Sequence, residues 1–252
     1  MTLMCLWFHT RTRFTSRAML VQKLERYDSL FKVASARHTD AVFLTLTTDP
    51  SRFSNLYEAN RQFSHSFNRF MSRLRGYFAR RGQHLEYIAV YEFTKSGLLH
   101  AHVIIFGVRY LLPVRVISRW WSEAGQGRVV YIYRLRNVDG RWVWARRRPR
   151  DVRAGEGAED YLKKYLRKAL RLASTLDTSD VKKVLPLALY WAFNKRFFTY
   201  SRSLLPSSRR TAEAVVSEYL WVGTYRLEDL PDWVFWLPHR VYSPPSRGPP
   251  PT

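Results

Sequence analysis

Residues 86–107 read EYIAVYEFTKSGLLHAHVIIFG, and this stretch decides the fold. Its two halves, Glu86 to Phe93 and Leu98 to Gly107, are rich in β-branched and aromatic residues, which is typical of strands. The residues between them end in Lys95-Ser96-Gly97, and a three-residue hairpin loop with glycine in the left-handed third position is a recognised connection. The stretch therefore predicts an antiparallel β-hairpin.

Strand and helix patterns on either side extend this hairpin into a domain. Residues 41–47, AVFLTLT, predict a buried strand, and residues 56–78 carry apolar side chains at the three- and four-residue steps of an amphipathic helix. A helix at 114–124, a second hairpin at 128–146 and a helix at about 157–173 are predicted to follow. This order predicts an α+β fold of the split βαβ kind, an antiparallel central sheet with helices mainly on one face.

Three segments are expected along the chain. Residues 1–39 form a basic N-terminal extension with a helix around 18–34, and residues 40–205 form the domain. Residues 206–252 are expected to hold a short helix and then a tail. The tail ends in SPPSRGPPPT, which is too rich in proline for a packed core.

The charge of the chain limits its partners. Its 252 residues include 42 Lys and Arg against 20 Asp and Glu, a net charge of +22, and 33 of the basic residues are arginine. A positive field of this size attracts nucleic acid or an anionic membrane surface, and arginine favours bidentate contacts with phosphates. The 46% of hydrophobic residues provide the material for a core, which excludes disorder throughout.

Other classes of protein are excluded by what the sequence lacks. One cysteine, Cys5, excludes an internal disulfide framework and a cysteine-rich zinc site, and fits a reducing compartment such as the cytoplasm. The sequence has no uncharged apolar run of about 18 residues, so we expect no transmembrane helix. It has no P-loop, which argues against a built-in nucleotide-driven motor.

A cluster of possible metal ligands lies in the predicted hairpin. His100 and His102 are two residues apart on a strand, so both imidazoles point to the same face. If Thr94 pairs with Leu98 across the loop, Glu92 lies opposite His100 and shares that face. Two imidazoles and a carboxylate leave coordination positions open, which suits a catalytic Mg²⁺ or Mn²⁺.

Other interpretations of this cluster remain open. The two histidines could be structural and satisfied by hydrogen bonds, and Glu92 could pair with Lys95 or an arginine. A loop one residue shorter or longer would place Glu92 on the wrong face, because side chains alternate along a strand. Glu86 is a poorer substitute for Glu92.

A second motif, YLKKYLRK at residues 161–168, lies on the last predicted helix. Tyr161 and Tyr165 are four residues apart and each is followed three residues later by a lysine, Lys164 or Lys168. On a helix these four are neighbours, so both hydroxyls can approach one site. Nearby ammonium groups are expected to favour the phenolate, which is the better nucleophile. The alternative is an amphipathic helix with aromatic anchors and a solvated basic face.

Together these motifs resemble the HUH endonuclease family, in particular the two-tyrosine replication initiators of rolling-circle plasmids and viruses. The resemblance covers the strand FLTLT at 43–47, HAHV at 100–103 with an upstream glutamate, and YLKKYLRK. It implies a ferredoxin- or RRM-like HUH fold for residues 40–205. It also implies a nicking and joining enzyme that cuts single-stranded origin DNA through a 5′-phosphotyrosine intermediate.

The resemblance assigns a role to each motif. Glu92, His100 and His102 would hold Mg²⁺ or Mn²⁺, and Tyr165, which we favour for the first attack, or Tyr161 would attack the scissile phosphate. Lys164 and Lys168 would support this chemistry, and a host DNA polymerase and helicase would act with the protein. The motifs thus favour DNA over a membrane surface as the anionic partner, and we expect no membrane partner. The alternatives are a transposase or relaxase with the same chemistry, or a non-catalytic basic nucleic-acid-binding protein.

The stretch RNVDGRWVWARRRPR at 136–150 contains the candidate DNA contacts. We expect arginines to follow the phosphates and tryptophans to stack on unpaired bases. Equally, the tryptophans could be core residues and the arginines solvated. The candidates are Arg146, Arg147, Arg148, Arg150, Trp142 and Trp144.

Overall fold

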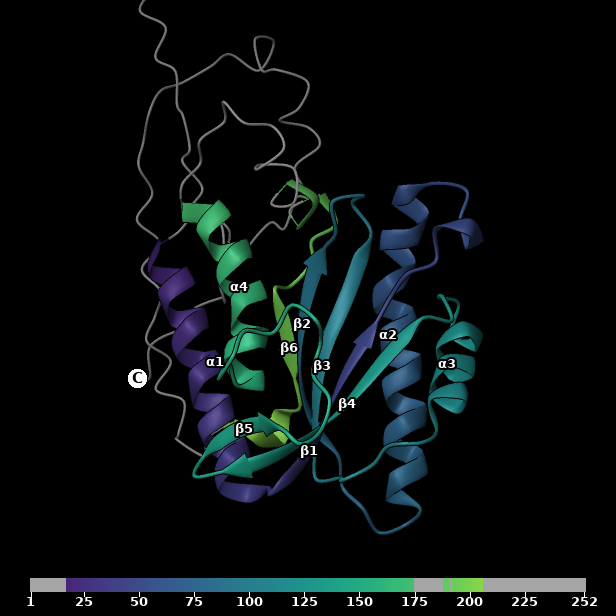
Figure 1. Cartoon of the computed structure of the whole chain (residues 1–252). Coiled ribbons are helices and arrows are strands. Elements are labelled where there is room, and N and C mark those ends of the chain that lie inside the picture. Colours follow the sequence, from purple (N-terminus) through teal and green to yellow (C-terminus); the bar gives the residue numbers. More distant parts are fainter. Residues whose placement is uncertain (1–16, 175–187, 191, 206–252) are drawn as a thin grey trace, which may run out of the picture. The chain divides into compact units, whose positions relative to one another are not determined.

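The computed structural model describes residues 17–174, 188–190 and 192–205. Six strands form one antiparallel sheet in the order β5-β4-β1-β3-β2-β6 (Figure 1). Their bounds are β1 Asp40–Leu46, β2 Glu86–Phe93, β3 Leu99–Phe106, β4 Val130–Val138, β5 Arg141–Trp144 and β6 Phe198–Tyr200. The helices are α1 Arg17–Arg37, α2 Leu56–Ala79, α3 Val114–Glu123 and α4 Ala158–Ser174, and two short 3-10 turns are η1 Pro50–Arg52 and η2 Arg202–Leu204.

The antiparallel α+β fold expected from the sequence is confirmed, with one difference in its layers. Helices cover both faces of the sheet instead of mainly one, α2 and α3 on one side and α1 and α4 on the other (Figure 1). Phe67 of α2 packs edge-on against Tyr91, whereas Phe31 of α1 packs edge-on against Phe106 on the opposite face. The central strand β1 is buried from Ala41 to Leu46, so apolar side chains on both of its faces need cover.

Helix α1 is part of the same core, although the sequence predicts that residues 1–39 form an extension outside the domain. Tyr27, Leu30, Phe31 and Ala34 are buried in the hydrophobic core with the residues of the sheet. The Tyr27 hydroxyl also donates a hydrogen bond to the backbone carbonyl of Glu159 in α4, at 2.9 Å. The predicted short helix and proline-rich tail at 206–252 lie outside the described residues.

The register of the β2–β3 hairpin is the one that the sequence predicted. The Thr94 backbone N–H donates to Leu98 O at 2.9 Å, Gly97 has φ +78°, and Glu92 lies opposite His100. The buried Asn60 of α2 fastens the loop, because its side-chain amide donates to Gly97 O at 2.8 Å and accepts from Leu99 N at 3.1 Å. The loop length and this clamp together determine which strand residues face α4.

No helix in the described part of the chain is both long enough and apolar enough to cross a membrane.

Candidate functional site

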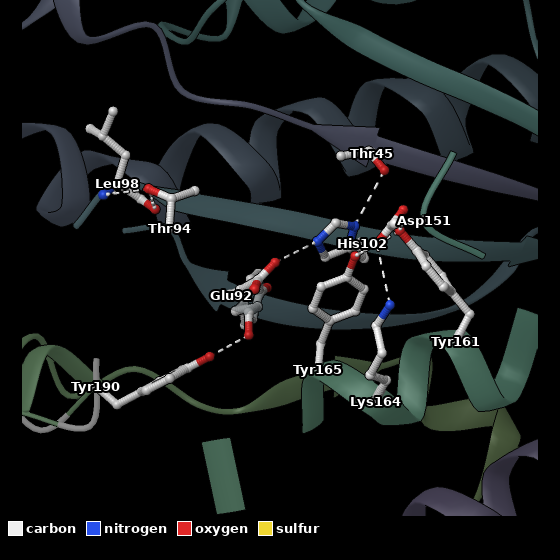
Figure 2. Close-up of polar contacts among 11 residues, drawn as sticks. Thr45, Glu92, Thr94, Leu98, His102, Asp151, Tyr161, Lys164, Tyr165 and Tyr190 are labelled. Atoms are coloured by element: carbon white, nitrogen blue, oxygen red, sulfur yellow. Dashed lines mark hydrogen bonds and ion pairs between the residues drawn. The ribbon is translucent and has the colours of Figure 1, made fainter. Parts of the chain in front are cut away.

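The histidine motif lies on β3, in the middle of the sheet, on the face covered by α4. Glu92 and Val90 of β2 are the direct partners of His100 and His102, so Glu92 and both imidazoles share a face. His102 Nε2 is 3.2 Å from Glu92 Oε2 (Figure 2). The three residues that the sequence proposed as metal ligands are therefore neighbours on one patch of the sheet.

Thr45 of β1 holds the other side of the His102 ring. Its Oγ1 lies 3.3 Å from His102 Nδ1, and both side chains are buried (Figure 2). A carboxylate can only accept hydrogen bonds, so Nε2 donates to Glu92 and Nδ1 accepts from Thr45 in a neutral ring. The threonine hydroxyl can also accept from Nδ1, so it can support the opposite tautomer, in which Nε2 is free for a ligand.

His100 is suited to bind a cation. Burial, together with the nearby His102, lowers the pKa of His100 to about 4, while the charge of Glu92 opposes this shift. The imidazole is therefore neutral near pH 7 and keeps a lone pair for a ligand. Neutral imidazole and carboxylate are both ligands of divalent metal ions.

The imidazole and carboxylate groups of His100, His102 and Glu92 are of the types that bind a divalent cation. Their side chains are not arranged around a common point. In the part of the chain that the structure describes, no group of three His, Cys, Asp or Glu side chains is placed to hold a metal ion. Glu92 and His102 hydrogen-bond to each other, which satisfies both groups in the absence of an ion. A cation would take the place of that hydrogen bond.

Glu86, the substitute for Glu92 suggested by the sequence, is engaged elsewhere. It lies at the opposite end of β2, is buried, and its Oε2 is 2.6 Å from His38 Nε2. Arg37 donates to its other oxygen at 3.4 Å. Burial by itself would raise the pKa of Glu86, but hydrogen bonds from Ser203 and His38 and the charges around it lower the pKa below its ordinary value. Glu86 is therefore an ion-pair residue.

Helix α4 places the two tyrosines against the histidine motif. The ring of Tyr165 stacks on the ring of His102, with centroids 4.1 Å apart and an angle of 11° between the planes (Figure 2). Tyr161 packs edge-on against Phe43 of β1, with 5.6 Å between centroids. Two motifs that are about 60 residues apart in the chain therefore form one site.

Asp151, in the loop before α4, connects the hydroxyls of the two tyrosines. The Tyr165 hydroxyl donates to the Tyr161 hydroxyl at 2.7 Å, and the Tyr161 hydroxyl donates to Asp151 Oδ1 at 2.8 Å (Figure 2). Lys164 Nζ donates to Asp151 Oδ2 at 3.2 Å. The sequence does not point to Asp151, because a single aspartate among arginines shows no spacing that relates it to the tyrosines.

The expectation that Lys164 favours the phenolate form of the tyrosines is wrong for this arrangement. Burial raises the pKa of Tyr161 and of Tyr165 far above the ordinary value, and Asp151 adds to both shifts. Lys164 is paired with Asp151, and the side chain of Lys168 lies outside the described residues. Burial by itself would raise the pKa of Asp151, but hydrogen bonds from Tyr161 and Lys164 lower it, so Asp151 is a carboxylate that orients neutral phenols.

Comparison with known proteins identifies the family. The model of the family described as "Replication-associated protein ORF2" matches residues 41–170, about half of the chain. The chain belongs to this family. The matched residues extend from β1 into α4, so they include the histidine motif, Glu92, Asp151 and both tyrosines.

A viral protein is similar to most of the chain. The chain is 29% identical over 221 residues to "Uncharacterized protein 1" of Halorubrum pleomorphic virus 1, and the match covers 79% of this chain. It covers 42% of the viral protein, so the chain spans about two fifths of the length of that relative. No solved structure matches the chain.

The arginines proposed to contact DNA are on the surface of this family member. Arg146, Arg147, Arg148 and Arg150 are all exposed in the segment between β5 and α4. Arg146 and Arg148 line a cavity of about 610 Å³ together with Trp144. Trp144 itself is half-buried, and its Nε1 donates to Glu156 O at 3.0 Å.

The proposal that Trp142 stacks on DNA bases is wrong. Its side chain is fully buried and lies 5.1 Å from the ring of Phe106, centroid to centroid. Its backbone N–H donates to Glu159 Oε2 at 2.8 Å, which ties β5 to α4. Side chains alternate along β5, and position 142 points inward, so Trp142 is a core residue.

Trp142→Ala is therefore expected to affect stability and to leave the affinity of the folded protein for DNA unchanged. Deleting a buried tryptophan costs about 3–5 kcal/mol of unfolding free energy, because the cavity closes incompletely. Urea unfolding measures this loss. The exposed Arg147→Ala is the control and should change stability by about 0.5 kcal/mol or less. A Trp142→Ala protein as stable as the original would contradict the burial.

Proposed function

We propose that this replication-associated protein nicks and joins single-stranded DNA and so initiates rolling-circle replication. The observation that supports this most is the stacking of Tyr165 on His102, which places a candidate nucleophile against a candidate metal ligand. The family membership supports a role in replication, and the net charge of +22 suits DNA as the partner. The membership also favours replication over transposition or conjugation, where the same chemistry could act.

The reaction that fits these residues is a transesterification. The Tyr165 oxygen attacks the scissile phosphorus, a Tyr165 O–P bond forms, and the bond from phosphorus to the 3′ oxygen breaks. The 3′ oxygen leaves and takes up a proton, while the 5′ phosphate stays on the tyrosine. The covalent link keeps the energy of the phosphodiester, so joining needs no ATP. Tyr161 would cut the regenerated origin after one round.

Glu92, His100 and His102 would hold Mg²⁺ or Mn²⁺ beside the tyrosines. When bound, the ion would polarise the scissile phosphate and stabilise the charge that develops on it. The chain's own residues do the positioning. Thr45 orients His102, Asp151 holds the Tyr161 hydroxyl, and the stacked imidazole limits the motion of the Tyr165 ring. The neutral tyrosines lose their protons only as the reaction proceeds.

The partners follow from the products. A free 3′-hydroxyl on single-stranded origin DNA is a primer for a host DNA polymerase. The chain contains no P-loop, so a host helicase or supercoiling would separate the strands.

A gel assay for a covalent adduct tests the proposed function. The protein is incubated with Mn²⁺ and a broad set of labelled single-stranded oligonucleotides, and the products are separated under denaturing conditions. We expect a labelled band that migrates with the protein, and no such band after chelation of the metal. If folded protein with added metal forms no adduct with any oligonucleotide, the proposal fails and a non-catalytic DNA-binding role takes its place.

A further inference from the structure

Tyr131 of β4 is an exposed aromatic residue in line with the candidate site. It lies opposite Thr45 of β1, and Thr45 lies opposite His102 of β3, so the three residues form one row across the sheet. Direct partners in an antiparallel sheet share a face, and adjacent strands are about 4.8 Å apart. Tyr131 is therefore about 10 Å from His102 on the same face. The residue is 51% exposed.

Tyr133 extends this aromatic surface and anchors it to the core. It is two residues farther along β4, opposite Phe43, and its ring lies 6.4 Å from that of Phe43 and 6.0 Å from that of Trp144. Phe43 in turn packs against His102 and Tyr161. We name Tyr131 and Tyr133 the β4 platform. A continuous set of aromatic rings connects it to the tyrosine helix.

A positive charge lies beside the β4 platform. Burial, with Tyr131 and Asp151 nearby, raises the pKa of the Tyr133 hydroxyl, and the guanidinium of Arg150 opposes this shift. Contacts connect the same region to Tyr133: its ring lies 6.0 Å from that of Trp144, Trp144 lies 5.7 Å from Tyr161, and the Tyr161 hydroxyl donates to Asp151, the residue after Arg150. Arg150 is exposed and follows the run of exposed arginines at 146–148. Aromatic rings beside cations are what a single-stranded nucleic acid requires, because its bases stack and its phosphates need counter-charges.

We propose that Tyr131 stacks on an unpaired base of the single-stranded DNA substrate, within about three nucleotides of the phosphate that Tyr165 attacks. The limit follows from the distance of about 10 Å to His102, since a stacked strand rises about 3.4 Å per nucleotide. Arg150 pairs with a phosphate of the same segment. This inference rests on the proposed function, because the ligand is the DNA strand that the site containing His102 and Tyr165 would cut.

The test measures DNA binding in a protein that cannot react. In a chain carrying Tyr161→Phe and Tyr165→Phe, the affinity for mixed-sequence single-stranded oligonucleotides is measured by fluorescence anisotropy. Tyr131→Ala should weaken binding roughly tenfold, because stacking on one base is lost. Tyr131→Phe should bind like the parent, because the ring is kept. Thermal unfolding confirms that each variant is folded.

Tyr110→Ala is the matched control. Tyr110 is even more exposed, at 68%, and its ring is next to Arg134, whose side chain is on the other face of the sheet from Tyr131. This variant should bind DNA as the parent does. Three outcomes would each overturn the stacking proposal. Tyr131→Ala and Tyr110→Ala could weaken DNA binding equally, Tyr131→Ala could leave binding unchanged, or Tyr131→Phe could weaken it as much as Tyr131→Ala.

The position of the stacked base is tested separately. A fluorescent adenine analogue is placed at successive positions around the nick site found in the adduct assay, and we expect quenching that depends on Tyr131 within about three nucleotides of the nick. If the original protein forms an adduct and Tyr131→Ala does not change DNA binding, only the proposed role of the β4 platform is overturned. Binding that depends on Tyr131 without any adduct would overturn the nicking reaction and keep the platform.

Discussion

A chain carrying both Tyr161→Phe and Tyr165→Phe is expected to form no covalent adduct with single-stranded DNA. Each change removes only the hydroxyl oxygen that would bond to phosphorus, so adduct formation should fall by at least about a thousandfold. The rings remain, including the ring of Tyr165 that stacks on His102. DNA binding should therefore survive, which anisotropy measures beside the denaturing gel.

The two single variants distinguish the roles of the Tyr161 and Tyr165 hydroxyls in cleavage. Tyr165→Phe should remove most of the first cleavage, because Tyr165 contacts His102, whereas Tyr161 is buried against Phe43 and donates to Asp151. Tyr161→Phe should keep the first cleavage and lose a later round. Tyr200→Phe is a control on β6, at the edge of the sheet. Adduct formation by the double variant would remove both assigned nucleophiles.

The second large effect is expected for His102→Ala. Loss of this imidazole should lower the rate of cleavage roughly a hundredfold or more. This corresponds to a loss of about 3 kcal/mol in the stabilisation of the transition state by a bound metal. Calorimetric titration with Mn²⁺ gives a readout that is independent of cleavage, and the variant should bind the ion more weakly. The cleavage rate in excess Mn²⁺ shows whether added metal restores activity.

Two further variants distinguish a specific loss of metal binding from a non-specific effect of substitution on the protein. His65→Ala removes an exposed histidine of α2, on the opposite side of the sheet, and should change neither Mn²⁺ binding nor cleavage. Thr45→Val keeps the shape of the side chain and removes the hydroxyl next to His102 Nδ1, so metal affinity should fall about tenfold. Normal Mn²⁺ affinity and cleavage in His102→Ala would contradict a metal site at this position.

The hairpin shows how far local sequence rules reach in this protein. The loop length and Gly97 were enough to predict that Glu92 lies opposite His100, because side chains alternate strictly along paired strands. The same reasoning about periodicity placed Tyr161 and Tyr165 near one another on a helix. These predictions depend on residues that are close in sequence, where geometry is repetitive.

Contacts between distant segments account for the features that the sequence does not predict or predicts wrongly. The pattern of strand β5 does not show which face of the sheet is covered, so the sequence leaves Trp142 open between a DNA contact and a core residue, and its burial decides for the core. The charge of Lys164 suggested phenolates, but Asp151 takes that charge and burial raises the pKa of both tyrosines. The effect of a charge depends on the partners that folding brings to it.

By itself, the sequence determined the α+β class, the hairpin register, the set of candidate ligands and the pair of tyrosines. Each of these depends on spacing within one or two neighbouring elements, which strand and helix geometry makes regular. The tertiary structure alone decided that helices cover both faces, that Asp151 joins the two tyrosines, and that Tyr131 lies in line with His102. Those facts depend on which distant segments pack together, and the packing is a property of the whole folded core.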